Sequence, residues 1–136
     1  MNNLNITERR SGSATVLDLQ GDIRLGEGNT ELHNILRFLV EKGERRILLN
    51  LADVSYIDSS GLGELVAGFA TLQKNGGELK ILHLTGRVHE LMTITKLFTV
   101  FDVFDDEQEA IDSFRAVSQS DRTEITTGKL DKASIA

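Results

Sequence analysis

The spacing of hydrophobic positions changes several times along the chain, and each change predicts a new element. Leu4 and Ile6 alternate with polar residues, which predicts a short edge strand. Residues 11–13 then predict a turn, and residues 14–20 predict a second strand. We expect these two strands to form an antiparallel hairpin.

Helical spacing follows the hairpin. Asn29 or Thr30 can cap a first helix, and Gly43 is expected to end it. The apolar residues of this segment recur every three or four positions, as the buried side of a helix requires: Leu32, Ile35, Leu36, Leu39 and Val40.

Branched apolar residues crowd the middle of the chain. Residues 47–51 predict a buried strand, and residues 54–57 predict its exit loop. After a short polar turn, helical spacing returns and predicts a second helix that runs to about Lys74. Its apolar positions are Leu62, Leu65, Val66, Phe69 and Leu72.

The last third of the folded part continues the alternation. Residues 75–77 predict a break, residues 79–84 a fourth strand, residues from 85 onward a shorter helix, and residues 100–104 a last short strand. Asp106 and Glu109 resemble a capping box before a final helix with a buried stripe of Ala110, Ile111, Phe114 and Val117. The order predicts an α/β domain whose mostly parallel mixed sheet has about five strands and about four helices.

The turn Asp58-Ser59-Ser60-Gly61-Leu62-Gly63 is the candidate functional site. It places two hydroxyls between a buried strand and a helix, and either Ser59 or Ser60 is expected to be the N-cap. The N-terminus of a helix favours an anion such as a phosphate. Gly61 and Gly63 leave the first turn without bulk. The plain alternative is an ordinary helix cap, since Ser and Asp are common capping residues.

The chain resembles the STAS family of anti-sigma factor antagonists from about residue 4 to residue 117. The matching segments are residues 16–21, 47–51, 56–63, 75–79 and 96–98 with Phe101. In that family the serine directly after the aspartate is phosphorylated, which implies Ser59 here. The resemblance implies a regulatory binding protein, not an enzyme, without a cofactor or metal of its own. Its partner would be an anti-sigma factor with serine kinase activity, which binds the ATP.

The resemblance also implies a partner-binding surface. It comprises Arg24 and the turn residues Asp58, Ser59, Ser60, Gly61, Leu62 and Gly63, within a rim formed by residues 21–28, residues 58–63 and the first turns of the second predicted helix. Arg24 stands where the family usually has an acidic residue. Its guanidinium can pair with a phosphoserine or select a different partner surface, and a solvated loop residue is the plain alternative.

Two other classes of function are alternatives. One is a non-switching STAS scaffold or accessory module of a stressosome-like or transport-associated complex. The other is a hydrolase, which the residues disfavour because the turn lacks the G-x-S-x-G spacing of a nucleophile elbow. His33 and His89 are expected on helix surfaces, and His83 is expected in a strand. The acidic residues Asp102, Asp105, Asp106 and Glu107 are expected to begin a helix rather than hold a metal.

Composition narrows the cellular role. The 136 residues carry a formal net charge of −6, with 15 Lys and Arg against 21 Asp and Glu, which argues against direct nucleic-acid binding. The absence of cysteine fits a reducing compartment. No apolar run is long enough for a membrane span, and the first residues lack an export pattern, so a cytoplasmic location is expected.

The predicted domain organisation is a STAS domain over residues 1–117 and a polar C-terminal tail over residues 118–136. The tail loses the hydrophobic periodicity and is rich in Ser, Thr, Asp and Lys. A homodimer that involves this tail stays an open alternative.

Overall fold

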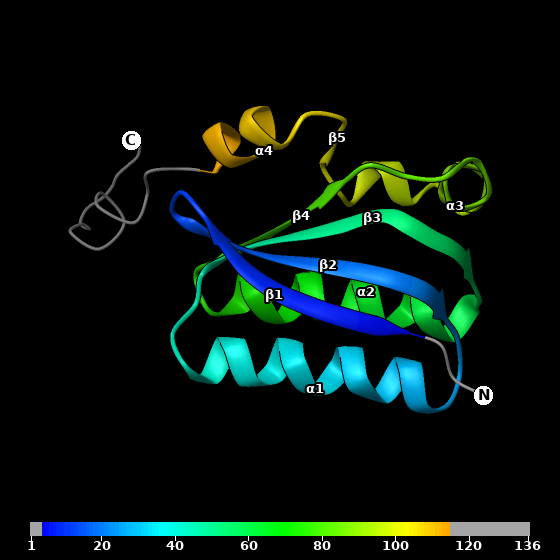
Figure 1. Cartoon of the computed structure of the whole chain (residues 1–136), viewed down its shortest axis with the longest axis horizontal. Coiled ribbons are helices and arrows are strands. Elements are labelled where there is room, and N and C mark those ends of the chain that lie inside the picture. The colour runs from blue at the N-terminus through cyan, green and yellow to red at the C-terminus, as the bar shows by residue number, and fades with distance from the viewer. Residues whose placement is uncertain (1–3, 115–136) are drawn as a thin grey trace.

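A computed structural model describes residues 4–114, apart from the side chains of residues 27 and 28. Its centre is a five-stranded sheet in the order β1-β2-β3-β4-β5 (Figure 1). The strands are β1 (Asn5–Ser11), β2 (Ala14–Ile23), β3 (Arg46–Ile57), β4 (Glu78–Leu82) and β5 (Val103–Phe104). β1 pairs with β2 in antiparallel fashion, and the other pairs are parallel. The predicted mixed sheet with an antiparallel edge strand is therefore confirmed.

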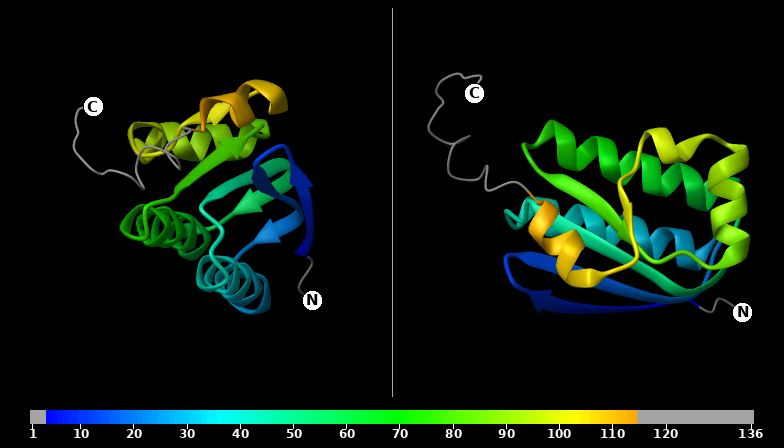
Figure 2. Two further views of the ribbon diagram at one scale, coloured as in Figure 1. Left: turned by 90° about the vertical axis from the view of Figure 1, so that its left-hand side faces the viewer. Right: turned by 90° about the horizontal axis from the view of Figure 1, so that it is seen from above.

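Helices cover both faces of this sheet. They are α1 (Glu27–Glu41), α2 (Ser59–Lys74), α3 (Gly86–Ile94) and α4 (Glu107–Ser113), with a short 3-10 helix η1 (Leu97–Thr99). α1 and α2 lie side by side under one face, whereas α3 and α4 lie over the other (Figures 1 and 2). No helix within residues 4–114 is long and apolar enough to cross a membrane.

Alternating side chains divide the core between the two faces. Leu17 and Leu49 join the main cluster with α1 and α2, whereas their neighbours Val16 and Leu48 join a smaller cluster with α4. All four are fully buried. The period of two along a strand thus assigns adjacent residues to different helical layers.

β2 and β3 are longer than the sequence predicts. β3 continues through the expected exit loop to Ile57, and β2 continues to Ile23, because the two strands stay paired along this stretch. Register shifts on either side of Gly21 accommodate the extension. The pairing of Ile23 with Ile57 places the loop after β2 directly beside the turn after β3.

The first helix also begins earlier than the sequence predicts. Its N-cap is Gly26, so Asn29 and Thr30 lie inside the helix and do not cap it. Gly26 has a φ of 112°, a conformation that glycine adopts without a steric penalty. Because the helix begins early, only residues 24–26 connect β2 to α1.

In the second half of the chain, two strands differ from the prediction and one helix cap agrees with it. The fourth strand ends at Leu82, and His83 leaves the sheet with a φ of 59°, so the prediction of a strand histidine is wrong. The last strand is only Val103–Phe104, the two residues that pair with β4, and η1 precedes it at residues 97–99. The Asp106 cap is confirmed, because its side chain accepts a hydrogen bond from the backbone N–H of Glu109. Val117 and the predicted tail lie outside the described residues.

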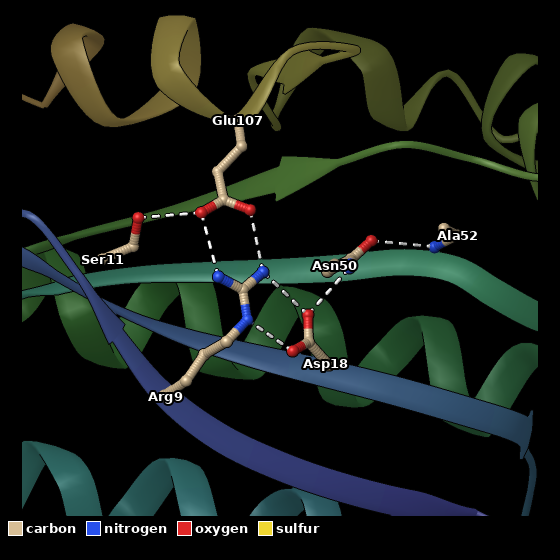
Figure 3. Close-up of polar contacts among 6 residues, drawn as sticks. All are labelled: Arg9, Ser11, Asp18, Asn50, Ala52 and Glu107. Atoms are coloured by element: carbon tan, nitrogen blue, oxygen red, sulfur yellow. Dashed lines mark hydrogen bonds and ion pairs between the residues drawn. The ribbon is translucent and has the colours of Figure 1, made fainter.

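A polar cluster ties the edge of the sheet to α4 (Figure 3). The Arg9 guanidinium contacts Asp18 Oδ2 at 2.6 Å and Glu107 Oε1 at 2.8 Å. Ser11 donates to Glu107 at 2.8 Å, and Asn50 donates to Asp18 at 2.8 Å. The Arg9 hydrogen bonds hold the pKa values of Asp18 and Glu107 below their ordinary range. Glu107, the first residue of α4, is thus engaged by Arg9.

We expect Arg9→Gln to lower the free energy of unfolding at pH 7 by about 1 kcal/mol. The estimate is modest because the Arg9 side chain is 38% exposed and water screens its charge. Depressed carboxylate pKa values stabilise the fold above the unfolded values of 3.8 and 4.5, and this contribution is lost as the pH falls below them. Urea titrations at pH 7 and pH 3 should show the difference between variant and wild type shrinking in acid. A difference that is equal at both values would contradict this account.

Candidate functional site

The site begins where β3 passes into α2. Asp58 is the N-cap of α2, and its Oδ1 accepts hydrogen bonds from the Gly61 N–H at 2.9 Å and from the Ser60 hydroxyl at 2.7 Å. The prediction that Ser59 or Ser60 is the N-cap is therefore wrong. A carboxylate one residue earlier takes the position, and both serines belong to the first turn of the helix.

Asp58 also holds the neighbouring loop in place. Its Oδ2 accepts a hydrogen bond from the backbone N–H of Leu25 at 2.9 Å, and its own N–H donates to the Ile23 carbonyl at 3.2 Å. Desolvation raises the pKa of Asp58, but the hydrogen bonds from Leu25, Ser60 and Gly61 outweigh it and hold the pKa below the ordinary value. The residue is therefore ionised at neutral pH.

The two serines of the turn have different surroundings. Ser60 is partly buried, and its hydroxyl is engaged by Asp58. Ser59 is exposed, and its hydroxyl has no hydrogen-bond partner among residues 4–114. Only the Ser59 oxygen is thus open to an incoming reagent or partner.

The other turn residues divide between packing and exposure. Gly61 is buried against β2, and a Cβ at this position would lie 2.5 Å from the Ile23 carbonyl oxygen and 2.8 Å from Ile57 Cγ1. Leu62 is only 8% exposed and belongs to the main core. Gly63 is exposed, with open space around it. The packing of Gly61 and Leu62 against the core therefore fixes the position of the turn.

Arg24 lies on the loop after β2, and its guanidinium contacts residues other than Ser59. Its Nη2 is 2.9 Å from Asp22 Oδ2, and its guanidinium carbon is 4.5 Å from the centre of the Tyr56 ring. The guanidinium carbon of Arg87, at the start of α3, is 5.8 Å from the same ring. Two guanidinium groups thus lie close to the Tyr56 ring, beside the turn.

The sequence predicts the loop of residues 21–28 as part of this surface, but it does not single out three of the residues that contribute to it. Asp22 and Arg87 were not singled out, because only the packing of β2 and α3 against β3 brings them to Tyr56. Leu25 was also not singled out within the predicted loop, although it is 76% exposed there and its backbone N–H is held by Asp58. An apolar side chain in a short polar loop was the available signal for Leu25.

The histidines lie in other surroundings. His33 Nδ1 is 2.9 Å from Glu64 on α2, and the His89 ring packs against Phe98 with centroids 5.1 Å apart. Within the described part of the chain, no group of three or more His, Asp or Glu side chains is arranged to hold a metal ion.

Comparison with known proteins identifies the family. The STAS domain model matches residues 5–110, so the chain belongs to the STAS domain family. The chain is 30% identical over 101 residues to the anti-sigma-B factor antagonist of Bacillus subtilis (strain 168), an alignment covering 74% of this chain and 91% of that protein. STAS proteins of this kind are non-enzymatic regulators, in agreement with the prediction from the sequence.

Solved structures show the same fold. An anti-sigma factor antagonist from Mycobacterium paratuberculosis matches with a TM-score of 0.70 at 16% identity, over 82% of this chain and 93% of that chain. The anti-sigma factor antagonist SpoIIAA matches in its unphosphorylated form with a TM-score of 0.61 at 21% identity, over 81% and 96% of the two chains. The phosphorylated form of SpoIIAA, from Bacillus, matches with a TM-score of 0.64 at 19% identity, over 79% and 97%.

We expect Gly61→Ala to destabilise the protein by about 1–3 kcal/mol, because the new methyl group would collide with the Ile23 carbonyl and Ile57. Gly63→Ala is the matched control in the same helix. It meets open space and should stabilise the helix by about 0.5–1 kcal/mol. Thermal unfolding of both variants gives the comparison. Equal stabilities would contradict the close approach of α2 to β2.

Proposed function

We propose that this chain is an anti-sigma factor antagonist whose binding to an anti-sigma factor is switched by phosphorylation of Ser59. The partner in this proposal is an anti-sigma factor that is also a serine kinase and supplies the ATP. The observation that carries the proposal is the free, exposed hydroxyl of Ser59, next to a serine whose hydroxyl is engaged. The relatives named anti-sigma factor antagonists support the class of partner.

The docking surface in this proposal is the rim, which we define as residues 21–28 and 58–63. Hydrogen bonds between Asp58 and both Ile23 and Leu25 join the two segments into one surface. Leu25, which is 76% exposed, offers an apolar contact to a partner. Such a surface is available without a change of fold.

Phosphorylation would change the charge of this surface at one point. A phosphoserine adds about −1.5 to −2 charges at pH 7, directly beside the ionised Asp58. Moving a complex from almost fully bound to almost fully free requires about 5.5 kcal/mol of differential binding. Burying an unpaired charge against a partner costs several kcal/mol, which is the same order. Local electrostatics therefore accounts for release while the fold stays the same.

The arrangement also selects between the two adjacent serines. A kinase must remove the hydroxyl proton and transfer the γ-phosphoryl group of ATP to that oxygen, with ADP as the leaving group. The Ser60 hydroxyl donates a hydrogen bond to Asp58 at 2.7 Å, so modification of Ser60 would break this hydrogen bond. The Ser59 oxygen is reached without breaking any hydrogen bond among the described residues. We therefore assign the modification to Ser59.

Incubation with the genomically neighbouring kinase of the HATPase type and ATP tests this assignment. We expect mass spectrometry to place one phosphate on Ser59 in the wild type and in Ser60→Ala, and none in Ser59→Ala. Ser59→Ala should bind the kinase at least as well as the wild type but should resist release by ATP. Ser59→Asp should bind more weakly, because it places a charge on the rim.

Two results would defeat the proposal. One is a wild-type protein that carries no phosphate on Ser59 after incubation with the kinase. The other is an unchanged affinity of Ser59→Asp for that partner. Loss of kinase binding in Ser59→Ala would instead make the hydroxyl a direct contact, which contradicts a switch by charge alone.

A further inference from the structure

We propose that Arg24 is a receptor within the same chain for the phosphate on Ser59. This inference rests on the proposed function, and it adds a ligand for the modified residue. In the unmodified protein Arg24 rests on Asp22 and Tyr56, and after phosphorylation it turns to the phosphate. The ligand is a phosphate monoester on a serine of the same turn.

The backbone of Arg24 is fixed beside the phosphorylation site. Both of its sequence neighbours form hydrogen bonds with Asp58, through the Ile23 carbonyl and the Leu25 N–H. Asp58 directly precedes Ser59 in the chain. The backbone of Arg24 is therefore held beside the turn, independently of the conformation of its side chain.

The side chain of Arg24 is free to change partners. It is 53% exposed, and its ion pair with Asp22 lies on the surface, where such pairs contribute little to stability. Asp22 also accepts a hydrogen bond from the Ser55 hydroxyl at 3.2 Å, and Tyr56 also has Arg87 at 5.8 Å. Departure of Arg24 thus leaves neither former partner without a contact.

A phosphate on Ser59 competes well for this guanidinium. It carries nearly twice the charge of the Asp22 carboxylate and offers three acceptor oxygens, two of which match the guanidinium fork. The phosphate would also lie close to the negative charge of Asp58. A nearby cation would therefore strongly stabilise the dianionic form of the phosphate. Arg24 is the only basic residue of the rim.

The exchange has a consequence for partner recognition. Phosphorylation would add charge at Ser59 and would also remove Arg24 from its place on Tyr56. An acidic group on a partner that contacts Arg24 would lose that contact at the same time. The single charge and short side chain of an aspartate at position 59 would draw Arg24 less strongly.

The test uses the full chain with phosphoserine placed at position 59 during translation, so that no kinase is needed. The second pKa of the phosphoserine, ordinarily about 6, is followed by phosphorus NMR as a function of pH. Four proteins are compared: the wild type, Arg24→Gln, Arg24→Lys and Arg37→Gln. Arg37→Gln is the matched control, because Arg37 is an exposed arginine of α1 that pairs with Glu41.

We expect the phosphoserine pKa to lie at least about half a unit lower in the wild type than in Arg24→Gln, since a nearby cation favours the dianion. Arg24→Lys should fall between them, because an ammonium keeps the charge but loses the paired contacts. Arg37→Gln should match the wild type. All differences should shrink in 1 M salt.

Equal pKa values in the wild type and Arg24→Gln would overturn the inference, as would an equal shift in Arg37→Gln. Neither result depends on a kinase, so the switch at Ser59 could still hold. Conversely, a kinase that leaves Ser59 unmodified defeats the proposed function, while the NMR comparison still decides whether Arg24 can bind the phosphate.

Discussion

The carboxylate of Asp58 is the group on which the site depends. It caps α2, engages the Ser60 hydroxyl and holds the loop after β2 through Leu25. Because Asp58 engages Ser60, Ser59 carries the exposed hydroxyl of the turn. One ionised group thereby sets both the shape of the rim and the identity of the serine that is open to modification.

The geometry around Asp58 follows from the sheet beneath it. β2 and β3 stay paired to Ile23 and Ile57, so their ends arrive together at one edge (Figure 1). Gly61 then allows α2 to start against the Ile23 carbonyl. On the face of the sheet that α4 covers, the Arg9 cluster ties three strands to α4 (Figure 3). The scaffold is thus braced by contacts that do not involve the rim, which suits a switch based on local charge.

Much of the fold could be predicted from hydrophobic spacing. The alternation of strands and helices, the end of α2 at Lys74 and the Asp106 cap follow from local patterns. The length of β3 could not, because Ala52 and Asp53 interrupt its apolar run, and only the pairing with β2 shows that the residues after them stay in the same strand.

The candidate site was predictable in position but not in its contacts. The run of Asp and Ser residues marks a helix start, yet Asp and Ser cap equally well, so sequence alone could not rank Asp58 above Ser59. The surroundings of Arg24 were hidden for a different reason. Asp22, Tyr56 and Arg87 lie far apart in the sequence and meet only through the register of β2 and β3 and the packing of α3.

The most direct test of the rim as a docking surface is hydrogen–deuterium exchange of the unphosphorylated protein with and without the kinase. The account expects slower exchange in peptides that cover residues 21–28 and 58–63, and little change in peptides from β1 or α4. Protection confined to β1 or α4, with both rim segments unchanged, would contradict it.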